Sequence, residues 1–262
     1  MATSVQKLAP GGGGGGCWLG GDITASSGEY GQAKEGTGTS IFDPVLTELA
    51  YRWFCPPGGH IIDPFAGGSV RGIVASVLGY SYTGHELRAE QVAANRAQAG
   101  AICPENPPHW ITGDSAETLR ARPMRPADFL FSCPPYGDLE VYSDDPADLS
   151  AMPHEDFLTA YRDIIAAGVD ALKPDRFAAF VVGDFRCKKG FYRNFTGETV
   201  AAFEAAGARY YNEAILVTAV GSLPIRVGKQ FKAGRKLGKT HQNMLVFCKG
   251  DPKRAAQACE GQ

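Results

Sequence analysis

The chain has 262 residues, of which 44% are hydrophobic and 21% are charged. This ordinary globular composition excludes a wholly disordered, collagen-like or coiled-coil protein. Lys and Arg number 26 and Asp and Glu 28, so the formal net charge of −2 gives no indication of a nucleic-acid partner, although it allows a local basic patch. The seven cysteines are scattered without a C-x-x-C pair, no apolar run could span a membrane, and the N-terminus has no apolar signal core. We therefore expect a reduced, cytoplasmic protein.

The chain divides into three predicted parts. Residues 1–35 contain six consecutive glycines and are expected to form a flexible tail, because such a segment buries too little apolar surface to offset its ordering entropy. A single ordered domain is predicted over 36–250, followed by a short C-terminal tail over 251–262.

Strands and helices alternate along the predicted domain. Asp43-Pro44 and the apolar spacing after it predict a helix that ends before Cys55-Pro56-Pro57. Further helices are predicted at 70–78, 89–100, 157–172 and 197–206. Strands are predicted at 60–63, 80–86, 110–114, 129–132 and 176–183, with a late pair at 214–220 and 243–249. This order predicts an α/β fold with an open, mostly parallel sheet that carries helices on both faces.

A glycine turn follows the first predicted strand. Asp63-Pro64-Phe65-Ala66-Gly67-Gly68-Ser69 lies at a strand's carboxyl end, where open α/β sheets bind ligands, and its glycines let backbone pass close beneath a ligand. Glu86 ends the next strand and could accept both hydroxyls of a ribose, while Asp114 could bond an adenine amino group. The turn has neither a G-x-G-x-x-G fingerprint nor a phosphate-binding Gly-Lys-Ser/Thr. S-adenosylmethionine is therefore favoured as its ligand; the alternative is an ordinary βα turn.

A stiff loop follows the strand at 129–132. Ser132-Cys133-Pro134-Pro135-Tyr136 takes the strand directly into two prolines and an aromatic residue. Such a loop could hold a planar ring against Tyr136 and aim a side-chain oxygen and a backbone carbonyl at the ring's amino group. The alternative is a structural turn with a packed tyrosine.

Together these motifs resemble the S-adenosylmethionine-dependent DNA methyltransferases that make N6-methyladenine or N4-methylcytosine. Asp63 to Ser69 is similar to that family's Asp-Pro-Phe-x-Gly-Ser-Gly cofactor motif, and Cys133 to Tyr136 is similar to its Asp/Asn/Ser-Pro-Pro-Tyr/Phe catalytic motif. Thr39 to Leu49 resembles the segment that flanks the methionine end of the cofactor, and its position gives the permuted motif order. The whole chain is similar to small phage-encoded DNA methylases.

The resemblance implies a Rossmann-like methyltransferase fold with an antiparallel C-terminal strand pair, in the cytoplasm of a bacterial or phage-infected host cell. It implies double-stranded DNA as partner, with N6-adenine slightly favoured over N4-cytosine, and a monomer or homodimer. The implied catalytic residues are Ser132, Cys133, Pro134, Pro135 and Tyr136. The implied cofactor-binding residues are Ser40, Phe42, Asp63, Pro64, Phe65, Ala66, Gly67, Gly68, Glu86, Leu87, Asp114, Ser115 and Ser132.

Cys133 departs from the catalytic motif, because a thiol is a weak hydrogen-bond acceptor. Ser132 could take the acceptor role, the Pro134 carbonyl could suffice with Cys133 in support, or the enzyme could be weak or inactive. Cys133 is not expected to be a nucleophile of the 5-methylcytosine type, because in those enzymes the cysteine follows a proline.

Two basic groups are candidates for binding DNA phosphates. The first is expected to be a mobile loop that orders on a polyanion, since glycines interrupt it and no acid does; it contains Arg226, Lys229, Lys232, Arg235, Lys236 and Lys239. The second lies among aromatic residues and contains Arg186, Lys188, Lys189 and Arg193. The alternative is a solvated charged face. The five histidines do not cluster, so no metal is expected. The rival functions are an RNA N-methyltransferase and a non-catalytic protein that binds DNA or cofactor.

Overall fold

The sheet forms the centre of the protein. The computed structural model describes residues 41–121, 125–137, 143, 145–217 and 223–260. Its seven strands have the order β3-β2-β1-β4-β5-β7-β6, in which β1 to β5 are parallel and β7 is antiparallel to both β5 and β6. The strands are β1 (His60–Asp63), β2 (Ser81–Glu86), β3 (His109–Thr112), β4 (Ala127–Ser132), β5 (Leu172–Val182), β6 (Arg209–Val217) and β7 (His241–Lys249). The predicted α/β fold with an antiparallel C-terminal pair is confirmed.

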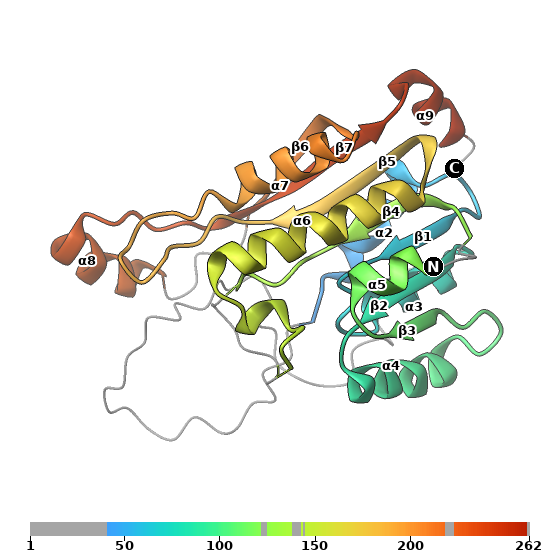
Figure 1. Cartoon of the computed structure of the whole chain (residues 1–262), viewed down its shortest axis with the longest axis horizontal. Coiled ribbons are helices and arrows are strands. Elements are labelled where there is room, and N and C mark those ends of the chain that lie inside the picture. Colours follow the sequence, from blue (N-terminus) through green and yellow to red (C-terminus); the bar gives the residue numbers. More distant parts are fainter. Residues whose placement is uncertain (1–40, 122–124, 138–142, 144, 218–222, 261–262) are drawn as a thin grey trace.

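Helices cover both faces of this sheet, as predicted (Figure 1). One face carries α2 (Pro44–Phe54), α3 (Val70–Val77), α4 (Ala89–Ile102) and α9 (Pro252–Ala258). The other face carries α5 (Ser115–Arg120), α6 (His154–Ala171) and α7 (Phe195–Ala205), and the short helix η3 (Leu149–Ala151) precedes α6. Helix α8 (Leu223–Gly234) lies at the far end of the long β6–β7 pair, away from the two covered faces (Figure 1). No helix in the described ranges is long and apolar enough to cross a membrane.

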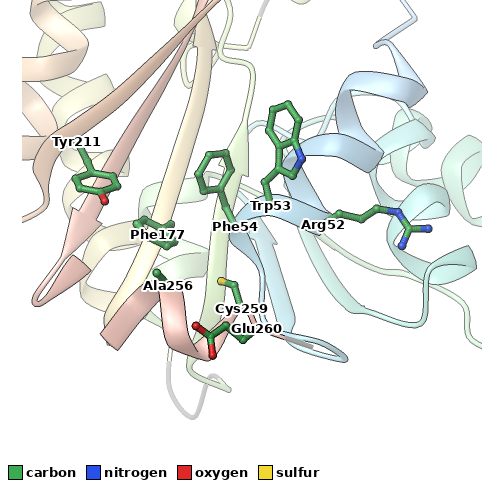
Figure 2. Close-up of a pocket in the computed structure, with 8 residues that line it drawn as sticks. All are labelled: Arg52, Trp53, Phe54, Phe177, Tyr211, Ala256, Cys259 and Glu260. Carbon is green, nitrogen blue, oxygen red and sulfur yellow. The ribbon is translucent and has the colours of Figure 1, made fainter. Parts of the chain in front are cut away.

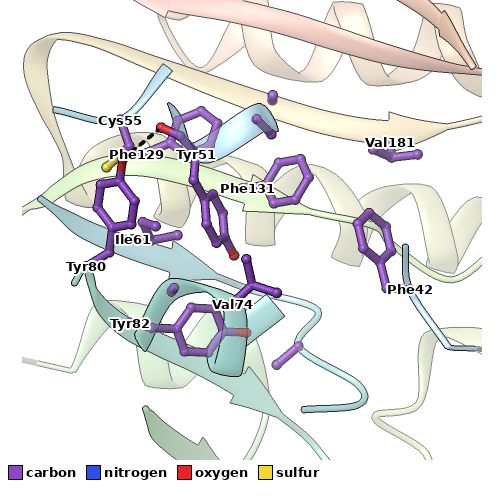
Figure 3. Close-up of a cluster of buried hydrophobic side chains, with 14 of the residues drawn as sticks. Phe42, Tyr51, Cys55, Ile61, Val74, Tyr80, Tyr82, Phe129, Phe131 and Val181 are labelled. Carbon is purple, nitrogen blue, oxygen red and sulfur yellow. Dashed lines mark hydrogen bonds between the residues drawn. The ribbon is translucent and has the colours of Figure 1, made fainter. Parts of the chain in front are cut away.

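Aromatic residues fill the core under α2. Tyr51 is fully buried and meets Phe131 edge-on at 5.6 Å between ring centroids (Figure 3). Its hydroxyl donates to the Arg71 carbonyl at 3.0 Å, and its own carbonyl accepts from the Tyr80 hydroxyl. Each such side chain contributes about 1.5–3 kcal/mol when buried. This packing fixes α2 and α3 against the strands whose ends form the candidate site.

The start of α2 follows from its sequence, as predicted. Asp43 caps the helix and accepts from the backbone N–H groups of Val45 (2.8 Å) and Leu46 (3.3 Å). Pro44 occupies the first turn, where its missing N–H needs no partner. The helix ends at Phe54, before Cys55-Pro56-Pro57.

Three segments differ from the predictions. The prediction of a mobile loop at 226–239 is wrong for its first part, which belongs to helix α8. The apolar residues Leu223, Val227 and Phe231 recur every four residues, as in a helix. The third strand ends at Thr112 rather than at residue 114, because Gly113 adopts a φ of +137°. The predicted tail at 251–262 contains α9, which Asp251 caps. The predicted tail at 1–35 lies outside the described residues.

Candidate active site

Asp63 at the end of β1 anchors the glycine turn from behind. It is 0% exposed, and its carboxylate accepts from Arg71 Nε at 2.6 Å and from the Tyr82 hydroxyl at 2.7 Å. The Phe65 backbone N–H donates to the same carboxylate at 3.2 Å. Asp63 therefore holds the turn in shape and does not face the open side of the turn.

Arg71 is a site residue that the sequence analysis missed. It is 5% exposed, and its Nη2 donates to the carbonyls of Phe65 (2.6 Å) and Ala66 (3.1 Å). Burial alone would lower its pKa, but the neighbouring Asp63 carboxylate raises it above the usual value, so the guanidinium is charged. The available signal was an arginine on the buried face of the predicted helix at 70–78. Arg71 thus joins the acid and the turn in one buried network.

Phe42 closes this network on the side of α2. Its ring lies 4.6 Å from the Arg71 guanidinium carbon and 5.8 Å, edge-on, from the Phe131 ring. A cation over an aromatic face is stabilising when both are desolvated. Phe42, predicted to contact the cofactor, is buried behind the turn. Ser40, also predicted, lies outside the described residues.

The open side of the turn faces Glu86. Gly67 has a φ of +51°, and apart from the adjacent residues no atom of the described chain lies within 4 Å of the positions where β-carbons on Gly67 and Gly68 would stand. The Gly67 N–H donates to Glu86 Oε2 at 3.0 Å, and the Arg88 N–H donates to Oε1 at 3.0 Å. The turn thus offers backbone without side chains beside a carboxylate at the end of β2. An acid faces the glycines, and Arg88, the cation beside it, is paired with that acid at 3.4 Å, so these residues fit a nucleoside that carries no phosphate.

Other predicted cofactor residues lie around the turn. Asp114 follows β3, and its Oδ1 accepts from the Ala116 N–H at 2.7 Å as the cap of α5. Ser115 is buried and donates to the Pro64 carbonyl at 2.6 Å, which ties α5 to the turn. Leu87 is half-buried after Glu86. The structure thus brings the ends of β1, β2 and β3 together.

Ser132 does not have the geometry of a substrate-binding residue. It is 0% exposed at the end of β4, and its hydroxyl donates to Asp63 Oδ1 at 2.5 Å. The Ser132 Oγ also accepts a hydrogen bond from the Phe65 backbone N–H at 3.1 Å. Because its proton and one of its two lone pairs are used behind the turn and the residue is fully buried, this geometry argues against the idea that Ser132 takes the acceptor role. The hydroxyl instead fastens β4 to the turn.

The loop after Ser132 is partly open. Cys133, Pro135 and Tyr136 are half-buried, and Pro134 is buried. Cys133 is therefore the first side chain of the catalytic motif that reaches the surface.

Tyr136 is held on three sides. Its ring meets the rings of Phe185 and Phe195 edge-on, at 6.0 and 5.9 Å. Its hydroxyl accepts a hydrogen bond from Nε2 of Gln242, and Gln242 Oε1 is buried without a hydrogen-bond partner among the described residues. Gln242 was not predicted: it lies 106 residues from Tyr136, and only the antiparallel pairing of β7 with β5 brings it there.

The structure places the two predicted basic groups together. Lys236, which follows α8, has its Cε 2.9 Å from where a β-carbon on Gly190 would stand, in the connection between β5 and α7. The exposed cations of the combined surface are Lys188, Lys189, Lys229, Lys232 and Arg235, and Arg186, Arg193 and Lys236 are half-buried. The side chain of Arg226 is not among those that the structure describes.

Lys239 differs from these cations. Its Nζ lies 3.7 Å from the β-carbon position of Gly183, and Gln242 Cγ lies 3.2 Å from the same point. Burial lowers the pKa of Lys239, and the carboxylate of Asp184 partly opposes this shift. Lys239 therefore belongs beside the Tyr136 loop rather than on the exposed basic surface.

A separate groove lies at the other end of the strands. It has a volume of about 570 Å³ and is lined by Arg52, Trp53, Phe54, Phe177, Tyr211, Ala256, Cys259 and Glu260 (Figure 2). None of the predicted cofactor or catalytic residues lines this groove. No group of three or more His, Cys, Asp or Glu residues suited to a metal occurs in the described part of the chain.

Known structures share this architecture. No protein-family model matches the chain, and no curated protein matches its sequence. The CcbJ methyltransferase of Streptomyces caelestis aligns with a TM-score of 0.53 and 11% identity over 83% of this chain and 100% of that one. A SAM-dependent methyltransferase of Methanosarcina mazei aligns at 0.52 and 12% over 77% and 97%. TrmN of Thermus thermophilus aligns at 0.51 and 16% over 79% of this chain and 48% of TrmN, so the chain spans about half of TrmN. The protein therefore has the Rossmann-like methyltransferase fold.

Proposed function

We propose that this protein is an S-adenosylmethionine-dependent methyltransferase that modifies the exocyclic amino group of a base in double-stranded DNA. One observation carries the proposal. The Cys133–Tyr136 loop leaves β4 directly beside the turn, because Ser132 at its root is bonded to Asp63 at 2.5 Å. A base held at the loop and a cofactor held at the turn would thus be neighbours. N6 of adenine is the favoured target, with N4 of cytosine second.

The turn and the adjoining strand ends would hold the cofactor. Glu86 would accept the ribose hydroxyls, and Asp114, two residues after β3, would accept from the adenine amino group. Gly67 and Gly68 leave space for close approach of the nucleoside. When bound, S-adenosylmethionine supplies an electrophilic methyl group on a sulfonium.

The loop would hold the target base. The Tyr136 ring would stack on a base that has been flipped from the duplex, at a cost of a few kcal/mol. The Pro134 carbonyl would accept one N–H of the amino group, and the Cys133 thiol would give weak support. No general base is required before attack, because the nitrogen would lose its proton to water after the methyl group has transferred and S-adenosylhomocysteine has left. Alignment of the amino lone pair would therefore supply most of the rate enhancement.

The exposed cations around Lys189 and Lys232 would neutralise phosphates of the duplex. Increasing salt should weaken DNA binding steeply, in proportion to the phosphates contacted. A flat salt response would remove this role from the basic surface.

Two variants together test whether the base and the cofactor bind at separate places. Tyr136→Ala should abolish most methyl transfer to unmethylated genomic DNA while the Kd for S-adenosylmethionine changes less than twofold. Glu86→Ala should raise that Kd at least tenfold, because a ribose loses a charged acceptor. Equal loss of cofactor binding in both variants would contradict the separation of the two sites. Transfer confined to RNA would favour the RNA N-methyltransferase.

A further inference from the structure

The connection between β5 and α7 folds into a short hairpin with an exposed phenylalanine near its tip. Arg186 and Tyr192 form an antiparallel bridge, and the Cys187 N–H donates to the Phe191 carbonyl at 2.8 Å. Gly190 turns the chain with a φ of +93°. Phe191 is 73% exposed, although burial of a phenylalanine side chain is favourable. The fold holds this side chain out in solvent.

Cations surround this phenylalanine. Lys188 and Lys189 are exposed at the tip. The Arg186 guanidinium carbon lies 3.8 Å from the centre of the Tyr192 ring, and its Nη1 donates to the Gly190 carbonyl at 2.9 Å. The tip therefore combines a braced backbone, an apolar ring and positive charge. Phosphates would face the cations of such a tip, and bases would face the ring.

The base of the hairpin lies against the Tyr136 ring. The Arg193 N–H donates to the Phe185 carbonyl at 2.9 Å and closes the hairpin there. Phe185 and Phe195, which flank the hairpin, are the two rings that meet Tyr136 edge-on. Cys187, which is bonded to Phe191 across the hairpin, follows Phe185 by two residues, a span of about 7 Å at about 3.3 Å per residue. The tip thus stands a short, fixed distance from the position proposed for a flipped base.

We propose that Phe191 is a wedge that enters the base stack of duplex DNA where the target base has left it. The proposal rests on the proposed function, because it needs a base to leave the duplex. Apolar side chains inserted between base steps stabilise opened duplexes in other proteins. Stacking of an aromatic ring on a base stabilises the complex by an amount comparable to the cost of opening the duplex.

A binding measurement tests the wedge without methyl transfer. The full chain is titrated with a fully paired duplex and with the same duplex carrying one abasic site, where a wedge enters without displacing a base. The wild type should prefer the abasic duplex by about 5- to 30-fold, the equivalent of about 1–2 kcal/mol. Phe191→Ala should lose most of this preference, and Phe191→Trp should keep it. Trp53→Ala, which removes an aromatic that is 53% exposed at the other end of the strands, is the matched control and should keep it too. An unchanged preference in Phe191→Ala would overturn the wedge.

A rate measurement separates the wedge from the proposed function. Phe191→Ala should slow methyl transfer to duplex DNA at least tenfold while the rate on heat-denatured DNA stays within twofold of wild type. Equal losses on both substrates would overturn the wedge and leave the methyltransferase proposal standing. If the wild type methylates neither DNA but prefers the abasic duplex, and Phe191→Ala lacks this preference, the proposed function alone would be overturned.

Discussion

Replacing Ser132 with alanine should destabilise the fold by about 2 kcal/mol. The change removes a hydroxyl that donates to the buried Asp63 carboxylate at 2.5 Å and accepts from the Phe65 N–H. A hydrogen bond to a charged group contributes about 1.5–3 kcal/mol. Asp63 keeps its bonds from Arg71 and Tyr82, and the Phe65 N–H keeps Asp63 as acceptor at 3.2 Å, so the lower part of that range applies. Tm should fall by about 4–8 °C.

Urea unfolding and cofactor binding measure this prediction together. The Ser132→Ala midpoint should fall with an unchanged m-value, and the Kd for S-adenosylmethionine should rise because the turn loses a support. Thr199→Val on α7 removes a buried hydroxyl that is bonded to the Tyr161 hydroxyl of α6 at 3.0 Å. This variant should cost about 1 kcal/mol without changing that Kd. Unchanged stability and Kd in Ser132→Ala, with methyl transfer lost, would show that the hydroxyl acts on the substrate and would refute the reasoning.

Three further predictions concern buried or half-buried side chains. Arg71→Leu should cost about 3–5 kcal/mol of unfolding free energy, because Asp63 is left buried without a cation, and adding Asp63→Asn should restore stability; a double variant no more stable than the single would contradict the pairing. Burial lowers the pKa of His85 to about 4, so below pH 6.5 the unfolded chain binds a proton that the folded protein does not, and the free energy of unfolding should fall by about 2 kcal/mol from pH 8 to pH 5. In urea titrations His85→Asn should lack this part of the pH dependence, and an equal fall in stability in the wild type and the variant would assign the effect to another group. Gln242→Leu and Tyr136→Phe should each raise the KM for DNA several-fold without changing cofactor affinity, and the double variant should have a KM no higher than either single variant. Additive increases in KM would show that the hydrogen bond between the two side chains does not position the loop.

The sequence predicts the frame of the site well. Asp63, Gly67 and Glu86 lie where strand ends and turns are marked by local signals: an apolar run, two glycines and an acid at the next strand end. Their convergence follows from the parallel order of β1 and β2, which short connections through helices impose. The Pro-Pro pair likewise fixes the loop after β4 by local geometry alone.

Contacts between distant segments escape such reasoning. From the sequence, Arg71 is an ordinary helix residue, and only the folded structure shows it buried against Asp63. Gln242 contacts Tyr136 only because β7 runs antiparallel to β5. Ser132 illustrates the limit differently. A hydroxyl next to a catalytic motif suggests a functional group, but every residue of β4 is buried, and Ser132 is the last of them. Helix α8 was missed because Gly228 and its cations suggest a loop, whereas the spacing of its apolar residues suggests a helix.

The most direct measurement is methyl transfer from labelled S-adenosylmethionine to unmethylated genomic DNA and to total RNA, with the products digested to nucleosides and identified by mass. The account predicts label in DNA, as N6-methyladenine or N4-methylcytosine, and its loss in Tyr136→Ala. No label in either nucleic acid, with the cofactor still bound, would contradict the methyltransferase proposal and leave a protein that only binds.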